Sequence, residues 1–192
     1  MNTVNLSRRI LCVGIVLSFI AACQTSKQRG WTAYDRGDFE GALESWRPLA
    51  EAGDADSQYL VGLIHDEGRG VPVDPRQAAI WYRMAAEQGH APAQNNLGVL
   101  HFRGKGVPQS FDEAAQWYAK AAVQGFAPAQ NNLGVLYLFG QAVPQDPGQA
   151  HSLIAKAALL GDGKAQRTLT SVERFRHRSQ AEARPSLAAP PE

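Results

Sequence analysis

The stretch Ala91–Leu100, APAQNNLGVL, occurs a second time, letter for letter, as Ala127–Leu136. The two copies start 36 residues apart. Periods of about 20 to 50 residues are typical of solenoid proteins, because each unit is too small to bury its own apolar face and must bury it against its neighbours. The duplicated stretch therefore predicts a repeat architecture.

Each repeat has the pattern of two helices. In the middle repeat the apolar face of a first helix has members at i, i+4, i+7 and i+8, namely Ala93, Leu97, Leu100 and His101. The run Gly104–Pro108 interrupts this periodicity. Ser110, followed three residues later by Glu113, is a capping box that starts the second helix. The period therefore indicates an all-α chain of helix pairs without strands.

The same start and stop signals recur at the repeat period. Asp74 and Asp146 stand at the equivalent helix start, each with a glutamine three residues later. A glycine follows each second helix, where a left-handed residue is expected. These glycines are Gly53, Gly89, Gly125 and Gly161.

The repeated residues fit the pattern A-Q-x-x-L-G-x-x-(Y/H)-x-x-G-x-G-V-P-x-(D/S)-x-x-x-A-x-x-W-x-x-x-A-A-x-x-G, which resembles the Sel-one-like repeat family, a relative of the tetratricopeptide repeats. Full units match at 57–92, 93–128 and 129–164, after a divergent first unit at 31–56 and before a capping helix at 165–178. The resemblance implies a right-handed α-solenoid of antiparallel helix pairs with a concave inner surface.

The amino terminus has the features of a secretory signal peptide over residues 1–22. Arg8 and Arg9 precede the apolar run Ile10–Ala22, which at about 20 Å is too short for a bilayer core of about 30 Å. Ile20–Cys23 resembles a bacterial lipobox, which implies cleavage before Cys23 and a lipid on its sulfur. Ordinary cleavage beside an incidental cysteine is the alternative.

A lipidated Cys23 would begin a short polar tether at 23–30. Stable anchoring needs more than one acyl chain, which a lipoprotein supplies. By analogy with enteric sorting, Gln24 after the cysteine indicates a periplasm-facing protein of the outer membrane. At the other end, the Ala- and Pro-rich tail 179–192 is expected to be disordered.

The charge balance does not favour nucleic acid as a partner. The chain has 19 basic and 18 acidic residues, and loss of Arg8 and Arg9 with the leader would leave 17 basic residues. The basic glycine turns Gly68–Gly70 and Gly104–Gly106 lie between helices, whereas a phosphate-binding loop follows a strand. Neither feature indicates a nucleotide or another cofactor.

No catalytic residues, metal ligands or cofactor site are expected. His65 and His101 share the repeat position of Tyr137, so an aromatic slot explains them, with an adventitious metal site as the alternative. His90 shares its position with Phe126, and we expect no group to converge on it. We therefore expect a non-catalytic, protein- or peptide-binding scaffold of the cell envelope; an assembly accessory of an envelope machine and a cell-wall hydrolase are the alternatives.

By resemblance to tetratricopeptide modules, one face of the first helices lines the binding groove. Its members are Tyr59, Leu63 and Asp66, then Asn95, Val99, Phe102 and Arg103, and then Asn131, Val135 and Leu138. The amides of Asn95 and Asn131 could both donate to and accept from the backbone of an extended peptide. In the alternative interpretation these two side chains only bond to adjacent helices.

Anchoring is predicted to depend on the Cys23 sulfur. Cys23→Ser should leave an unprocessed or soluble chain, because serine has no thiol to carry the lipid. Membrane fractionation and the size of the processed chain test this. Wild-type processing and membrane association of the variant would contradict the lipoprotein hypothesis.

Overall fold

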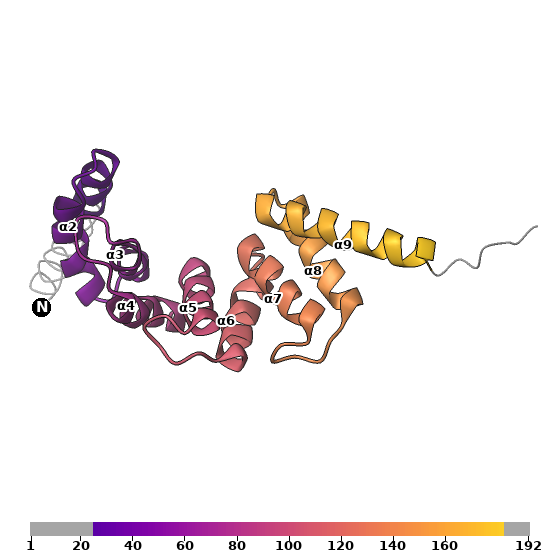
Figure 1. Ribbon diagram of the computed structural model, residues 1–192. Helices are drawn as coiled ribbons and strands as arrows, with labels where there is room; N and C mark the ends of the chain where they lie inside the picture. The colour runs from indigo at the N-terminus through magenta and orange to yellow at the C-terminus, as the bar shows by residue number, and fades with distance from the viewer. Residues whose placement is uncertain (1–24, 183–192) are drawn as a thin grey trace, which may run out of the picture. The chain divides into compact units, whose positions relative to one another are not determined.

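The computed structural model describes residues 25–182, with side chains up to residue 174 (Figure 1). This part of the chain holds nine helices and no strand, which confirms the predicted all-α class. A first helix at 25–35 is followed by α2 (Phe39–Glu51), α3 (Ala55–Glu67), α4 (Pro75–Glu87), α5 (Ala91–Arg103), α6 (Phe111–Val123), α7 (Ala127–Phe139), α8 (Pro147–Leu159) and α9 (Gly163–Glu182).

The helices belong to two compact units, Met1–Gln109 and Ser110–Glu192. In the amino-terminal unit α2 packs on α3, α3 on α4, and α4 on α5. In the carboxy-terminal unit α6 packs on α7, α7 on α8, and α8 on α9, which also contacts α7. Consecutive helices therefore pair within each unit, as the 36-residue period predicts.

The predicted start and stop signals of the helices are confirmed. The Ser110 hydroxyl accepts the Glu113 N–H at 3.2 Å, and the carboxylates of Asp74 and Asp146 accept N–H groups of the first turns of α4 and α8. The glycines after the second helices have positive φ: 97° for Gly53, 91° for Gly89, 82° for Gly125 and 86° for Gly161.

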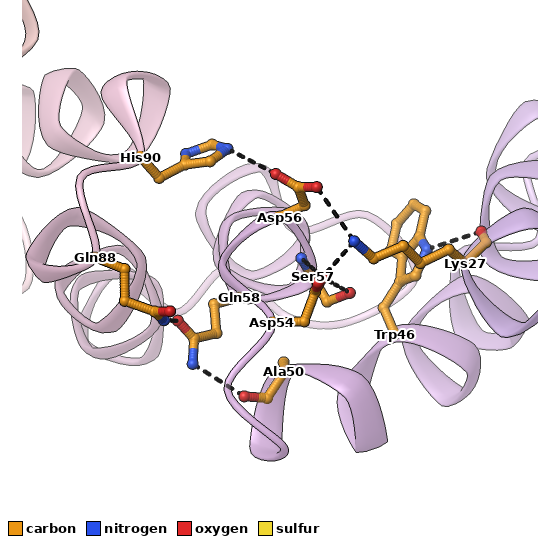
Figure 2. Close-up of polar contacts among 9 residues, drawn as sticks. All are labelled: Lys27, Trp46, Ala50, Asp54, Asp56, Ser57, Gln58, Gln88 and His90. Atoms are coloured by element: carbon orange, nitrogen blue, oxygen red, sulfur yellow. Dashed lines mark hydrogen bonds and ion pairs between the residues drawn. The ribbon is translucent and has the colours of Figure 1, made fainter. Parts of the chain in front are cut away.

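One side-chain hydrogen bond recurs at every junction between a second helix and the next first helix. A glutamine Nε2 donates to the carbonyl of an alanine eight residues earlier (Figure 2 shows the first pair). The pairs are Gln58 with Ala50 (3.0 Å), Gln94 with Ala86 (3.0 Å), Gln130 with Ala122 (3.3 Å) and Gln166 with Ala158 (3.3 Å). Each of these carbonyls also accepts the backbone N–H of the glycine three residues later, so the glutamine is a second donor at the helix end.

The expectation of a polar tether over 23–30 is wrong for residues 25–30, which are helical. Gly30 of this helix is buried against Trp46 of α2, and a Cβ at Gly30 would overlap the indole. The Trp46 indole N–H also donates to the Lys27 carbonyl at 3.3 Å. Gly62 approaches Tyr82 in the same way. The first helix of the divergent unit therefore begins before residue 31, where the sequence interpretation placed the start of that unit.

The carboxyl end also differs from its predicted boundary. Residues 179–182, assigned to a disordered tail, form the end of α9, so the capping helix is longer than 165–178. The predicted signal peptide 1–22, Cys23 and residues 183–192 lie outside the described residues. Between residues 25 and 182, no helix combines the length and the apolar character needed to cross a membrane.

Ala142 is in the left-handed region, with φ of 59°. Its repeat equivalents are Gly70 and Gly106, at φ of 68° and 70°. Their Cα atoms lie close to the start of the preceding second helix, where a Cβ at Gly106 would overlap the backbone of Pro75. The third turn therefore has the same left-handed conformation as the other two, with alanine in place of glycine. The Cβ of Ala142 makes this backbone conformation unfavourable.

Ala142→Gly should raise the free energy of unfolding by about 0.5–1 kcal/mol, because relief of the left-handed strain outweighs the extra freedom of the unfolded chain. Urea denaturation of the wild type and the variant measures the difference. The reverse change Gly70→Ala is the matched control and should destabilise. Destabilisation by Ala142→Gly would contradict the assigned conformation.

Candidate partner-binding surface

The predicted groove residues of the amino-terminal unit lie on α3 and α5. Tyr59, Leu63 and Asp66 of α3 are partly exposed. On α5, Val99 and Phe102 are partly exposed and Arg103 is exposed, whereas Asn95 is buried, with 7% of its surface accessible. This part of the predicted surface is therefore mostly apolar and aromatic, with a cation at the end of α5.

A polar network fixes the aromatic part of this surface. The Asn96 side chain is hydrogen-bonded to both Tyr59 and Tyr82, whose rings lie 5.8 Å apart. The Tyr82 hydroxyl donates to Asp66 at 3.5 Å, and the Asn95 amide donates to the Asn96 side chain at 3.2 Å. Burial raises the pKa of both tyrosines, so they stay neutral at neutral pH.

Asn96 was missed from sequence, where only the first asparagine of the duplicated Asn-Asn pair was assigned to the surface. The second asparagine stands one residue further round the helix, and it is the one that reaches Tyr59 and Tyr82. The pair itself was the available signal, since Asn95–Asn96 recurs as Asn131–Asn132.

The predicted residues of the carboxy-terminal unit lie on α7. Val135 and Leu138 are partly exposed, but Asn131 is 1% exposed, and its Oδ1 has no hydrogen-bond partner among the described residues. The expectation that Asn95 and Asn131 offer open amides to a peptide is therefore wrong. The reason is that a first helix is covered on several sides: α7 packs on α6, α8 and α9, so its buried arc is wider than one apolar stripe.

A charged cluster attaches the first helix to α3 (Figure 2). The Lys27 Nζ lies 2.6 Å from an Asp54 oxygen and 3.2 Å from an Asp56 oxygen. Burial opposes both charges, but the carboxylates raise the pKa of Lys27, and the bonds from Lys27 and Ser57 lower the pKa of Asp54. Because the cluster is partly exposed, we expect each ion pair to stabilise the fold by less than about 1 kcal/mol.

His90 has more partners than the sequence interpretation expected. Its Nδ1 accepts the Ala93 N–H at 3.2 Å and so caps α5, while its Nε2 lies 3.5 Å from an Asp56 oxygen. The ring also lies 4.8 Å from the Tyr59 ring. Burial lowers the pKa of His90 against the opposing effect of Asp56 and Asp54. A capping Nδ1 needs its lone pair, so the neutral imidazole fits this position.

The described residues offer little for metal or acid–base chemistry. Between residues 25 and 182, no three His, Cys, Asp or Glu side chains are arranged to hold a metal ion. His90, Asp56 and Lys27 are joined to each other and to helix ends, which is a structural arrangement. What the surface offers chemically is apolar contact beside hydrogen-bonding groups.

Acidification is predicted to weaken the fold through His90. Its pKa is lower in the folded chain than its ordinary value of 6.5, so the stability it contributes is present above pH 6.5 and is lost as pH falls through the folded pKa. His90→Asn keeps a capping oxygen that does not titrate there. Urea unfolding between pH 7.5 and 5 should therefore show a smaller loss of stability in the variant; equal losses would contradict this assignment. His65 is unchanged in both proteins and contributes equally.

The repeats of this chain match a known family of repeat proteins. The Sel1 repeat family model matches residues 55–90, 91–126 and 127–162, which is more than half of the chain. These windows have the predicted 36-residue length and begin two residues before the units assigned from sequence. Comparison with curated proteins gives no match.

Solved structures with the same helix pairs include a Sel1 repeat protein from Oxalobacter formigenes, 33% identical with a TM-score of 0.68 over 73% of this chain and 58% of that one. A protective antigen of uropathogenic Escherichia coli with an SLR fold is 39% identical, with a TM-score of 0.62 over 66% of this chain and 27% of that one. Cysteine rich protein B of Helicobacter pylori, 21% identical with a TM-score of 0.54 over 69% of this chain and 95% of its own, shares the fold.

The chain thus spans less than two thirds of the first two of these proteins. Each of the three consecutive family windows spans two helices that follow one another in sequence: α3 and α4, α5 and α6, and α7 and α8. The glycines and the glutamine at each junction occupy the same place in every window. On this evidence the chain belongs to the Sel1 repeat family.

Proposed function

We propose that this chain is a non-catalytic scaffold that binds a protein or peptide partner through the first-helix face of each unit, meaning the partly exposed members of the predicted groove on α3 and α5 in the amino-terminal unit and on α7 in the carboxy-terminal unit. The observation that carries the proposal is a recurring apolar position: Leu63, Val99 and Val135 stand 36 residues apart, and each stays partly exposed. Apart from Leu138, the other leucines and valines of α3, α5 and α7 are buried. Exposed apolar surface that recurs at fixed spacing is typical of binding surfaces.

The polar groups around these positions favour recognition of a polypeptide. In the amino-terminal unit, Asn96 is hydrogen-bonded to the buried Tyr82 and to the partly exposed Tyr59, so a partner would meet a Tyr59 ring that is already held in place. Arg103 is exposed at the end of α5, and Glu67 at the end of α3 is paired with Arg69. A partner of mixed charge would fit this edge.

We place this scaffold at the bacterial cell envelope as a lipoprotein. Ile20–Cys23 supports the placement through its resemblance to a lipobox, and the first helix begins by residue 25. An anchor on Cys23 would therefore leave almost no free chain between the lipid and the repeats. The partner would then be a periplasmic or membrane protein within reach of that surface.

Introduction of a positive charge at the recurring apolar position tests the proposal. Val99→Arg and Val135→Arg place a cation on the first-helix face, whereas Ile80→Arg places one on α4 at a residue that is already 52% exposed. Crosslinking in intact cells, followed by mass spectrometry, measures which proteins each variant captures. We expect the first two variants to lose the partners of the wild type and Ile80→Arg to keep them.

Melting temperatures must be recorded on the same samples, because Val99 and Val135 are partly buried. Loss of capture in a variant that unfolds near the wild-type temperature supports the proposal. Unchanged capture by both variants would contradict it. Where a variant is destabilised, the smaller changes Val99→Ser and Val135→Ser repeat the comparison.

A further inference from the structure

The carboxy-terminal unit contains a pocket of about 480 Å³ between α6, α7 and α8. Its volume is within the range of sites that bind small molecules or single side chains. Its lining combines apolar side chains with a few polar groups, among them Leu133, Leu153, Val123, Gln130, Tyr137 and Lys156. None of these residues belongs to the first-helix face proposed above.

The pocket exists because Leu153 stands where the two preceding repeats have a tryptophan. In the amino-terminal unit that tryptophan, Trp81, packs against a core cluster that includes Ala50 and Val61. The residues two periods later, Ala122 and Leu133, line the pocket. The volume that an indole occupies in the first unit is therefore left open in the second, because leucine is smaller.

A buried acceptor is also left without a donor there. Gln130 is 8% exposed; its Nε2 donates to the Ala122 carbonyl, and its Oε1 has no hydrogen-bond partner among the described residues. Two periods earlier, Gln58 Oε1 accepts from Gln88 Nε2 at 2.7 Å (Figure 2). The position of Gln88 is taken by Leu160, which cannot donate. This oxygen has almost no accessible surface, so it shows how this wall of the pocket has departed from the earlier repeat and is not a group that a ligand touches.

The rim of the pocket is also less charged than the equivalent positions of the earlier repeats. Glu51 and Glu87 of the earlier repeats are replaced by Val123, which is 85% exposed, and Arg83 is replaced by Ala119. Among the described residues that line the pocket, Lys156 alone is charged. The rim has thus lost its acidic member and gained apolar surface, while a cation remains, and the pocket would attract a carboxylate.

We propose that this pocket binds the side chain of a tryptophan from a partner polypeptide, with an Asp or Glu next to that tryptophan. The indole would occupy the place that Trp81 has in the other unit, against Ala122 and Leu133. The neighbouring carboxylate would pair with Lys156. Tryptophan suits the site because Trp81 and Trp117 stand at the repeat position of Leu153, so the open volume has the size of an indole.

The test is a titration of the ¹⁵N-labelled protein with the peptide acetyl-Gly-Trp-Asp-Gly-amide, followed by NMR. Saturable shifts of the amides around Ala119, Ala122 and Gln130 support the proposal. The matched peptide with Ala for Trp should bind roughly tenfold more weakly or worse, since it leaves the apolar volume unfilled. Equal affinity for the two peptides would overturn the proposed occupant.

Leu153→Trp restores the residue of the earlier repeats and should fold well, yet it should abolish the shifts because its own indole fills the pocket. Leu159→Trp, at an 87% exposed position of the same helix, is the matched control and should bind as the wild type does. Lys156→Gln should weaken binding and reduce its salt dependence. Absence of saturable shifts in the wild type, or undiminished binding by Leu153→Trp, would overturn the proposal. A dimer that Leu153→Trp dissociates would also overturn it, because the occupant would then be a second copy of this chain.

Discussion

The architecture depends on one hydrogen bond repeated at each junction, from a glutamine amide to the carbonyl of the alanine eight residues earlier. Each of these carbonyls accepts the N–H of the following turn glycine as well as the glutamine amide. Gln58, Gln94 and Gln130 are themselves buried, so their amides need a partner in the interior. The bond joins the end of each second helix to the first turn of the next first helix.

The side-chain oxygen of the same glutamine differs between the two units. Around Gln58 the Oε1 is satisfied by Gln88, and Trp81 packs on the core beneath. Around Gln130 the equivalent positions hold Leu160 and Leu153, so the acceptor is unpaired and a pocket is open. Several departures of the third repeat from the pattern thus lie around Gln130, apart from the turn at Ala142. Because the repeats are equivalent, the packing of Trp81 in the amino-terminal unit can be compared directly with the pocket beside Leu153 in the carboxy-terminal unit.

The residues of each first helix divide into a buried set, which packs against neighbouring helices, and a partly exposed set, which remains at the surface. Asn95 and Asn131 were drawn into the interior because each first helix is covered on several sides, whereas Leu63, Val99 and Val135 remain at the edge of the buried arc. At the amino terminus, Gly30 and the Lys27 contacts with Asp54 and Asp56 attach one more helix to the series. That helix lets the repeats begin close to the proposed anchor.

Sequence alone determined the period, the helix pairs, their caps and the glycine stops, because each of these depends on residues within one turn or one repeat. It also identified the family and the apolar positions of the first helices. Tertiary structure decided what depends on contacts between helices: the burial of Asn95 and Asn131, the cap formed by His90, the helix over residues 25–30 and the pocket beside Gln130. The physical reason is that burial is set by how many neighbours cover a helix and how large their side chains are, and a single-helix pattern contains neither quantity.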